Sequence, residues 1–385
     1  MKLYSHISII LSCLLILACG SSFAKESYSN GFPQTPNFFP IGVWLQSPAR
    51  AAQYKRIGIN TYVGLWGGPT EAQLAQLAKH EMFAIVSQNE LALASENRHV
   101  IKAWLHQDEP DNAQSTGLGF YGPCIPAAEV VRQTRAMTAR DGTRPVLLNF
   151  GQGIANEFWK GRGSCTGDQQ YYDIASRDAA ILSFDIYPVG SKIPQVKGNL
   201  EYVARGVTNL RGHATDGQNI WAILETTALD PNRPVSPAEV RAEVWMSLIH
   251  GARGLVYFVH EFSPKVREDA VFRHPDVVAE LSKTNSLINS LAIVLNSPDV
   301  KETIAVASTS PIATMMKKHE NRLYVFAVAM KNAASKPQFT IEGLGDVQAH
   351  VIGEDRSIVI RQGLFGDDFE GYGVHIYEIP LSNQN

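Results

Sequence analysis

Cysteine is scarce in this sequence, and no cysteine lies in a metal-binding arrangement. Only four cysteines occur in 385 residues, and they do not show the close ligand spacing that zinc sites use. The glycine-containing stretches 151–153 and 64–68 lack the spacing of a phosphate-binding loop and of a dinucleotide-binding motif, respectively. The sequence therefore predicts neither a metal site nor a cofactor.

An excess of one sign of charge is also missing. The chain has 34 Lys and Arg against 37 Asp and Glu, and its formal net charge is -3. No block of basic residues stands out, and nucleic-acid-binding proteins usually carry one. We therefore expect no nucleic-acid partner. Apolar residues make up 45% of the chain, which is enough for a large packed core.

Long hydrophobic runs are absent after the N-terminus, which itself carries a short one. Residues 7–18 are largely apolar and are followed by small residues, a pattern typical of a signal peptide. Two processing sites are open: cleavage after Ala24 in Ser-Phe-Ala, or a lipobox (Ile-Leu-Ala-Cys) that ends at Cys19 and leaves a lipidated cysteine. In both cases we expect residues 1–24 to lie outside the fold and the protein to be exported. The destination is the periplasm, the extracellular space or, as a lipoprotein, the outer membrane, with membrane contact only through a lipid on Cys19.

Two cysteines remain after the targeting segment. Cys124 and Cys165 form an even pair, and an exported protein meets an oxidising compartment. We expect a disulfide between them; two buried free thiols are the alternative.

Short apolar runs alternate with helical patterns from residue 39 onward. This rhythm is typical of repeated βαβ units with a parallel sheet. Eight runs can be counted, and eight is the number of strands that closes a (β/α)8 barrel. The expected strands are residues 40–46, 61–66, 83–89, 102–109, 145–150, 180–188, 219–226 and 254–262. Capping-box spacings at Thr70 and Ser236 mark the starts of two of the intervening helices.

The pattern changes near residue 296. Seven short β runs separated by turn residues follow, at 303–307, 313–317, 323–330, 338–341, 348–352, 357–361 and 374–379. Closely and regularly spaced strands of this kind predict an antiparallel β-sandwich. We therefore divide the mature chain into a barrel, residues 25–297, and a C-terminal β-sandwich, residues 298–385, packed directly on it.

Polar and aromatic residues gather where the expected barrel strands end. Barrel enzymes place their active site at the C-terminal ends of the strands. Glu109 ends the fourth strand and Glu225 ends the seventh, and we take these two as the catalytic candidates. The candidate substrate-binding residues are Trp44, Trp66, Gln88, Asn89, Asp108, Asn149, Asp185, Tyr187 and His260. Carboxylates, amides and indole rings together are what a carbohydrate site needs.

Several of these residues have an alternative, purely structural interpretation. Trp44 and Trp66 fit sugar platforms, but they also fit packing in the core or at the rim. Asp185 and Tyr187 fit a role in lining the site or orienting Glu225, and equally a structural role at the barrel rim. His260 fits two roles equally well: contact with the ligand, or a structural histidine that is hydrogen-bonded at the barrel rim.

The barrel region resembles the clan A glycoside hydrolases. These are retaining barrel enzymes with an acid/base glutamate at the end of strand 4 and a nucleophilic glutamate at the end of strand 7, the positions of Glu109 and Glu225 here. The stretch 242–258 and the strand end 184–188 (Phe-Asp-Ile-Tyr-Pro) are similar to the corresponding passages of several clan families. The resemblance covers roughly residues 39–297 and identifies no single family.

The resemblance implies a double-displacement reaction on an oligo- or polysaccharide, without a cofactor. Glu225 would attack the anomeric carbon while Glu109, initially protonated, donates its proton to the leaving oxygen. Two positions depart from the clan pattern. Asp108 stands where most members have an asparagine that binds the sugar 2-hydroxyl, and the strand 8 end carries His260 and Phe262 instead of the frequent tryptophan.

Two other functions remain open. Asp108 in place of asparagine fits a barrel that binds carbohydrate without turnover. A metal-dependent barrel hydrolase is the second alternative, but it needs clustered His and Asp at the strand ends, and no His-x-His follows the first strand.

Overall fold

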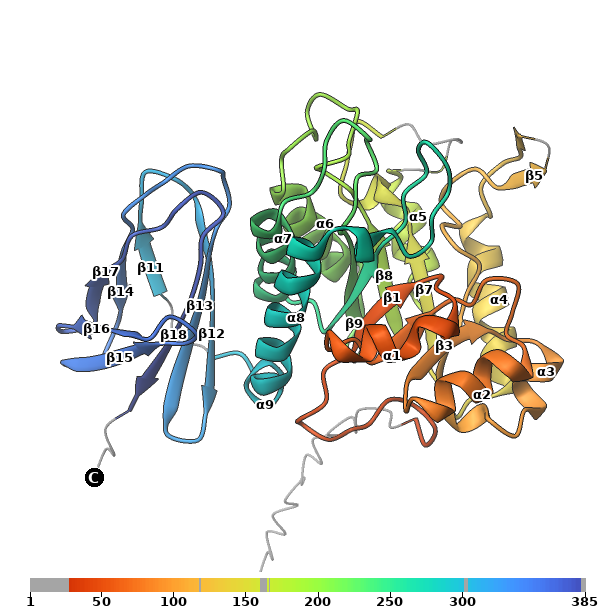
Figure 1. Cartoon of the computed structure of the whole chain (residues 1–385), viewed down its shortest axis with the longest axis horizontal. Helices are drawn as coiled ribbons and strands as arrows, with labels where there is room; N and C mark the ends of the chain where they lie inside the picture. The colour runs from red at the N-terminus through yellow and green to blue at the C-terminus, as the bar shows by residue number, and fades with distance from the viewer. Residues whose placement is uncertain (1–27, 118, 160–164, 166, 301–303, 382–385) are drawn as a thin grey trace, which may run out of the picture.

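The barrel is closed, as the sequence predicts. In the computed structural model, which describes residues 28–117, 119–159, 165, 167–300 and 304–381, eight parallel strands pair in the order β1-β10-β9-β8-β7-β4-β3-β2 (Figure 1). The ring closes where β1 pairs with both β10 and β2. The predicted targeting segment, including Cys19, lies outside the described residues.

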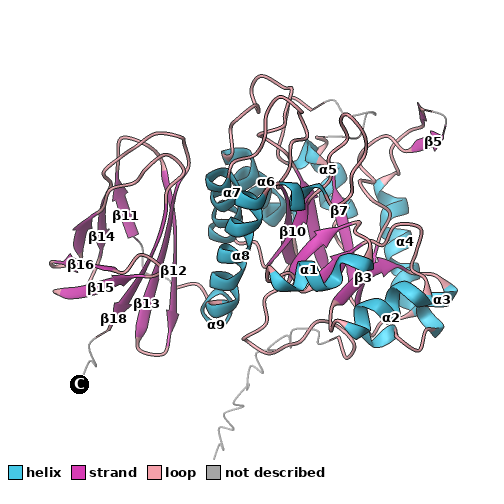
Figure 2. Cartoon of the chain, viewed as in Figure 1, coloured by secondary structure: helices cyan, strands magenta, loops and turns pink. Residues whose placement is uncertain are grey.

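The barrel strands are short, and helices surround them (Figure 2). The strands are β1 (Ile41–Trp44), β2 (Thr61–Val63), β3 (Phe83–Ser87), β4 (Ile101–Leu105), β7 (Val146–Phe150), β8 (Ile181–Asp185), β9 (Asn219–Glu225) and β10 (Gly254–Phe258). The α-helices are α1 (Ala51–Arg56), α2 (Glu71–Lys79), α3 (Glu90–Ala94), α4 (Ala127–Arg140), α5 (Gln169–Ala175), α6 (Glu201–His213), α7 (Pro237–Ile249), α8 (Pro275–Ser290) and α9 (Ala292–Leu295). Short 3-10 turns are η1 (Pro48–Arg50), η2 (Arg98–Val100), η3 (Gln152–Ile154) and η4 (Ala270–Arg273).

Alternation along each strand separates two apolar clusters. Side chains that point into the barrel form one cluster, which contains Val63, Ile85, Ala103, Leu147, Ile181, Trp221, Ile223 and Val256. Their strand neighbours, such as Leu148, Phe184 and Leu224, point outward and pack with the helices. This period of two is what a strand backbone imposes. It also fixes which residues at a strand end face the mouth of the barrel.

Both predicted capping boxes are present. The Thr70 hydroxyl accepts a hydrogen bond from the Gln73 backbone N–H at the start of α2, and Ser236 does the same for Glu239 at the start of α7. In each case the side chain three residues on caps the backbone in return. These caps satisfy helix-end N–H groups that otherwise have no partner, and so set where the two helices begin.

Two antiparallel sheets follow the barrel. One has the order β11-β14-β17 and the other β12-β13-β18-β15-β16. Their strands are β11 (Ile304–Ala307), β12 (Ile312–His319), β13 (Arg322–Ala329), β14 (Gln338–Ile341), β15 (Val347–Val351), β16 (Arg356–Ile360), β17 (Leu364–Gly366) and β18 (Val374–Pro380). Buried residues including Val325, Phe339, Ile341, Phe365 and Tyr377 fill the space between the sheets.

The second face of the larger sheet packs on the barrel helices. Helices α7 and α8 stand between the barrel strands and the C-terminal sheets (Figure 2). Trp245 of α7 stacks on Phe326 of β13, with ring centroids 5.7 Å apart, and both side chains are buried. Since α7 carries buried residues on nearly its whole circumference, it belongs to both hydrophobic interfaces.

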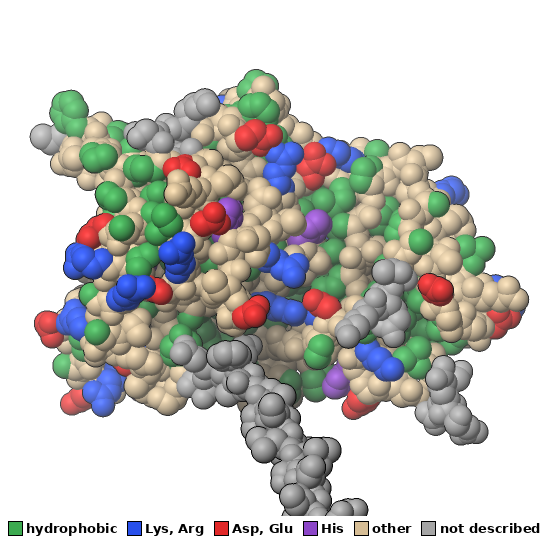
Figure 3. All heavy atoms as spheres, turned by 180° about the vertical axis from the view of Figure 1, so that it is seen from behind, with side chains coloured by type: hydrophobic (Ala, Val, Ile, Leu, Met, Phe, Trp, Pro, Cys, Tyr) green, Lys and Arg blue, Asp and Glu red, His purple; other side chains and the backbone are tan. Residues whose placement is uncertain are grey.

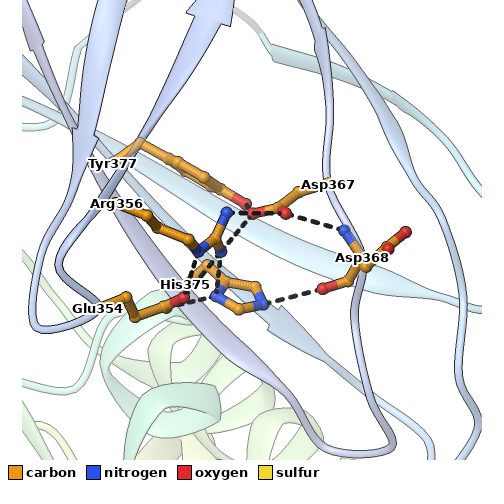
Figure 4. A network of polar contacts seen from close by, with 6 residues as sticks. All are labelled: Glu354, Arg356, Asp367, Asp368, His375 and Tyr377. Carbon is orange, nitrogen blue, oxygen red and sulfur yellow. Dashed lines mark hydrogen bonds and ion pairs between the residues drawn. The ribbon is translucent and has the colours of Figure 1, made fainter.

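A network of polar side chains lies in the C-terminal unit near this interface (Figure 4). Arg356 donates one hydrogen bond to each carboxylate oxygen of Asp367, at 3.0 and 2.8 Å. Tyr377 donates to the same carboxylate at 2.9 Å, and His375 contacts Glu354 and the backbone of Asp368. The network lines a groove of about 570 Å³ between α7, α8 and the sheet.

The structure shortens several of the expected strands: β2 ends at Val63 and not at residue 66, β3 at Ser87 and not at 89, and β8 at Asp185 and not at 188. Strand β4 ends at Leu105 and β10 ends at Phe258, so Glu109 and His260 lie in the loops beyond them. The two-residue alternation expected up to Glu109 therefore stops at Leu105. The sequence also missed β17 and a hairpin formed by β5 (Ser115–Gly117) and β6 (Phe120–Tyr121), which projects from the body of the molecule (Figure 1).

One face of the molecule carries side chains of both charge signs. On the face drawn in Figure 3, Lys and Arg side chains alternate with Asp and Glu and form no large patch of one sign. Within the described part of the chain, no helix is long and apolar enough to cross a membrane.

Candidate active site

Polar side chains from the fourth, fifth and sixth barrel strands meet at the C-terminal mouth. Asn149, near the end of β7, connects them: its amide nitrogen donates to Asp108 at 2.9 Å and to Asp185 at 3.1 Å. Its amide oxygen accepts a hydrogen bond from Ser183 at 2.8 Å. Since Asn149 is 1% exposed, its rotamer is fixed, and it holds two carboxyl groups beside each other.

Glu109 lies against this group. Its negative charge acts on Asp185, whose pKa it raises, and Asn112 donates to one of its carboxylate oxygens at 3.0 Å. The Glu109 backbone has φ of 40°, a left-handed conformation that is uncommon outside glycine, and its N–H donates to the Asn149 carbonyl at 3.1 Å. The tight turn after β4 thus aims Glu109 at the end of β8.

A glycine makes room for Glu109. A Cβ atom on Gly151 would lie 3.2 Å from one Glu109 carboxylate oxygen and 3.3 Å from its carboxyl carbon, which is tighter than an ordinary van der Waals contact. The Gly151 N–H donates to Asp111 at 2.9 Å. The loop after β7 therefore supports the Glu109 carboxyl group through its backbone.

Glu225 is the last residue of β9 and is fully buried. Its two carboxylate oxygens accept hydrogen bonds from the backbone N–H groups of Val189, at 2.6 Å, and Gly190, at 2.9 Å. Both donors belong to the loop that follows β8. Burial raises the pKa of Glu225 to about 8, although these two donors oppose the shift by stabilising the anion.

Tyr187 is the common neighbour of all these carboxyl groups. It lies two residues past β8. Burial and the negative charges of Asp185, Glu109, Asp108 and Glu225 together raise the pKa of its phenol well above the ordinary value. The charges of Glu109 and Glu225 therefore both act on the Tyr187 phenol. The strands that precede or carry them, β4 and β9, lie three strands apart in the closed ring.

The carboxyl groups raise one another's pKa values. Burial, and then the charges of Glu109 and Asp108, raise the pKa of Asp185 well above its ordinary value. Asp108 is open to water on one side yet surrounded by protein on the others; this confinement and the charge of Glu109 raise its pKa too. Because neighbouring carboxylates cannot all ionise easily, Asp185 is held toward its neutral acid form.

A row of rings leads from Tyr187 toward solvent. Its ring centroid lies 5.1 Å from that of Phe258, and the Phe258 centroid lies 4.8 Å from that of His260. Phe262, 54% exposed, stacks on His260 at 6.3 Å. Burial lowers the pKa of His260, so the ring is neutral near pH 7. Such a row can pack against the C–H faces of a sugar.

The other predicted binding residues lie in different surroundings. Trp44 is 6% exposed and belongs to the cluster inside the barrel, whereas Trp66 is 71% exposed on the loop after β2. The Asn89 side chain caps α3 by accepting from Ala92 at 2.8 Å. Gln88 donates to the Met137 carbonyl of α4 at 3.0 Å. These two polar side chains therefore hold helices, and Trp44 packs in the core.

Sequence reasoning missed several residues of the site. Asp111 is fully buried and accepts hydrogen bonds from Gly151 and, at 3.0 Å, from Tyr172. Its position directly after Glu109 and Pro110 was the available signal. Val189 and Gly190 contribute only backbone N–H groups. Since nearly every residue has such a group, the residue types gave no sign of this role.

Cys124 and Cys165 form the predicted disulfide, with Cα atoms 6.1 Å apart. The bond joins the loop between β4 and α4 to the loop between β7 and α5. Both loops leave the mouth next to Glu109. No cluster of three or more His, Cys, Asp or Glu side chains suited to a metal ion occurs within the described ranges.

No protein-family model matches the sequence, and no curated protein sequence matches it either. The fold is similar to solved structures of glycosidases. α-Galactosidase I from Mortierella vinacea superposes with a TM-score of 0.54 at 10% identity, over 91% of this chain and 98% of that one. The maltogenic α-amylase AmyB from Thermotoga neapolitana gives 0.52 at 9% identity (91% and 100%), and a GH30 endoxylanase from Clostridium papyrosolvens C71 gives 0.50 at 11% (89% and 96%). At these identities the likeness establishes the barrel fold that this chain shares with glycoside hydrolases.

Proposed function

We propose that this protein is a retaining glycoside hydrolase that acts on oligo- or polysaccharides. The observation that carries the proposal is that Glu109, in the loop after the fourth strand, and Glu225, at the end of the seventh, both act on the Tyr187 phenol at the barrel mouth. Glycosidases need two carboxyl groups with different protonation states on either side of the scissile bond. The shared fold with glycosidases and the row of rings beside Tyr187 add support.

The first step forms a covalent glycosyl-enzyme. A carboxylate oxygen of ionised Glu225 bonds to the anomeric carbon, and the bond from that carbon to the leaving oxygen breaks. The leaving oxygen takes a proton from Glu109, which lies beside Asp185 at the mouth of the barrel. Val189 and Gly190 hold the attacking carboxylate in place.

The second step returns the enzyme to its starting state. Glu109, now ionised, accepts a proton from a water molecule as the water oxygen bonds to the anomeric carbon. The ester bond to Glu225 breaks, and the carboxylate is released to its two backbone donors. Asn149 keeps Asp108 and Asp185 beside the sugar, where each carboxyl group can bond a hydroxyl.

Substitution of each glutamate tests the assignment. We expect Glu225→Ala to abolish hydrolysis of aryl glycosides and of polysaccharides. Glu109→Ala should hydrolyse unactivated substrates far more slowly but still release a good leaving group such as dinitrophenolate, which needs no acid. Glu261→Gln is the matched control, because Glu261 is a buried rim carboxyl group paired with His274. Wild-type rates for Glu225→Ala would refute the assignment.

A barrel that binds sugar without turnover is the second candidate. It is favoured by the two backbone hydrogen bonds to Glu225, which also suit a carboxylate that only holds the loop after β8. A screen of polysaccharides and aryl glycosides with chromatographic product analysis separates the two. Binding without any product would favour this second function.

We also propose that the protein is exported. The predicted targeting segment and the disulfide between Cys124 and Cys165 support this. Mass spectrometry of the mature N-terminus would distinguish cleavage after Ala24 from lipidation of Cys19. An intact N-terminal methionine would contradict export by either route.

A further inference from the structure

The C-terminal unit touches the barrel loop that holds Glu225. Tyr372, in the turn before β18, donates its phenol proton to the Gly198 carbonyl at 2.9 Å. Lys331 binds the neighbouring positions, with its ammonium group 3.0 Å from the Asn199 amide oxygen and 2.8 Å from Glu201. Tyr372 and Lys331 are joined to each other by a backbone hydrogen bond of 3.0 Å.

Gly198 is one hydrogen bond away from the residues that bind Glu225. Its N–H donates to the Pro188 carbonyl at 2.8 Å, which closes the loop from 188 to 198 on itself. The next two residues after Pro188 are Val189 and Gly190, whose N–H groups hold the Glu225 carboxylate. Tyr372 therefore binds the residue, Gly198, whose N–H closes the loop that positions Glu225.

The conformation of Tyr372 is specialised. Its φ is 59°, a left-handed value that is rare for an aromatic residue and unfavourable unless the surroundings compensate. The residue lies between two glycines, Gly371 and Gly373, and only 6% of it is exposed. The fold thus keeps a phenol at this point although a glycine would be less strained.

We propose that Tyr372 is a positioning residue for Glu225, through which the C-terminal β-sandwich holds the loop after β8 in its reactive geometry. The inference rests on the proposed role of Glu225 as nucleophile. It gives the second unit a part in the reaction through the loop that Tyr372 contacts. Loss of the Tyr372 hydrogen bond would let Val189 and Gly190 drift and misplace the attacking oxygen.

The charged groups around Glu225 determine how a movement of Val189 and Gly190 would change the pKa of Glu225. Arg233 precedes α7, and Glu239 and Glu243 lie on it; Tyr187 approaches from the end of β8. Glu243 is fully buried, and neither of its oxygens has a hydrogen-bond partner within the described chain. Two carboxyl groups, Glu239 and Glu243, and one cation, Arg233, lie near Glu225. The stability of the Glu225 anion therefore depends strongly on its two backbone N–H donors. Weaker donors would raise its pKa further.

Tyr372→Phe tests the inference, because it removes only the hydroxyl. We expect kcat to fall on the order of tenfold with KM little changed, and the rising limb of the pH–rate profile to move to higher pH. Tyr324→Phe is the matched control: Tyr324 is also a buried tyrosine of the C-terminal unit, but its hydroxyl contacts Glu378. It should keep wild-type kcat and pH profile.

The outcomes separate this inference from the proposed function. An active Glu225→Ala variant would refute both. An inactive Glu225→Ala variant with a wild-type kcat and pH profile for Tyr372→Phe would overturn only the inference. Equal losses in Tyr372→Phe and Tyr324→Phe would also overturn it, because the effect would then come from general weakening of the C-terminal unit. Thermal unfolding of each variant checks that the fold is kept.

Discussion

At the scale of the residue, the surroundings of Glu225 work in two directions. Burial and the nearby carboxyl groups of α7 favour the neutral acid, whereas the N–H groups of Val189 and Gly190 favour the anion. In its proposed role as nucleophile, Glu225 must be ionised to attack the anomeric carbon. In the free protein this balance leaves Glu225 largely protonated at neutral pH, so the reaction should depend on proton release from this group.

We therefore predict an alkaline rise in activity. Because burial raises the pKa of Glu225 to about 8, kcat/KM should increase as the pH rises through that value and should be low near pH 5. The pH dependence of kcat/KM on an aryl glycoside measures this directly, since it reports groups of the free enzyme. A rising limb centred between pH 4 and 5 would show that Glu225 is not the titrating group.

A second prediction concerns the space beside Glu109. Gly151→Ala brings a methyl group to 3.2 Å from the Glu109 carboxylate, so the carboxyl group must shift by a few tenths of an ångström. We expect kcat to fall on the order of tenfold while the melting temperature stays close to that of the wild type. Gly212→Ala, at a position with open space around the added carbon, should leave kcat unchanged. An unaltered kcat for Gly151→Ala would mean that the position of Glu109 is not critical.

The sequence could predict the polar side chains of the site, but it could not predict the backbone groups that hold them in place. Asn149, Asp185 and Tyr187 lie where polar residues interrupt an apolar strand, and the barrel brings all strand ends to one mouth. The backbone N–H groups of Val189 and Gly190 belong to residues of no distinctive chemistry. Their role depends on the path of a loop, which local patterns do not determine.

At the scale of the element, short apolar runs between helical patterns predicted all eight barrel strands. They placed the ends of β2, β4, β8 and β10 too late, because the residues that follow these strands give no local signal of where the chain leaves the sheet. The left-handed conformation of Glu109 is part of the turn after β4. Strand β17 is only three residues long, too short to leave a periodic signal.

The disulfide should stiffen the loops that leave the mouth after β4 and β7. It closes a separation of 41 residues, for which chain entropy gives a stabilisation of up to about 4 kcal/mol. We predict that the double variant Cys124→Ala/Cys165→Ala has a lower melting temperature and a reduced kcat, because both loops adjoin Glu109. Calorimetry and aryl-glycoside kinetics measure the two effects. The wild type treated with reductant should match the variant, and an unchanged melting temperature in both would contradict the prediction.

The polar network of Figure 4 predicts an acid-sensitive sheet. Hydrogen bonds from Arg356 and Tyr377 hold the pKa of Asp367 below its ordinary value. A carboxyl group with a lowered folded-state pKa stabilises the fold above its unfolded-state pKa, and this contribution disappears as the pH falls through the folded-state value.

Asp367→Asn should therefore melt several degrees below the wild type at pH 7, and the gap should narrow as the pH is lowered toward 3. Melting curves of both proteins across this range provide the measurement. Asp178→Asn is the control, because Asp178 is a carboxylate of the barrel paired with the exposed Arg135 and lies outside this network, and it should melt like the wild type. A gap for Asp367→Asn that is independent of pH would exclude the ionised carboxylate as its source.

At the scale of the whole molecule, α7 determines how the two units act together. One side of this helix packs on the barrel and the other on the larger C-terminal sheet, where Trp245 meets Phe326. Tyr372 and Lys331 extend the same interface to the loop that holds Glu225. If this interface transmits stability, the barrel and the sandwich should unfold as one cooperative unit.

Phe326→Ala tests this coupling. Truncation of a buried phenylalanine costs about 3–5 kcal/mol, and here the lost contacts join the two units. We predict that the single calorimetric transition of the wild type separates into two, with the C-terminal unit melting first and activity falling as it melts, because Glu225 then loses its support. Val359→Ala, on an exposed face of β16, should keep one transition. A single transition in Phe326→Ala, with calorimetric and van't Hoff enthalpies still equal, would show that contacts other than this ring pair hold the units together.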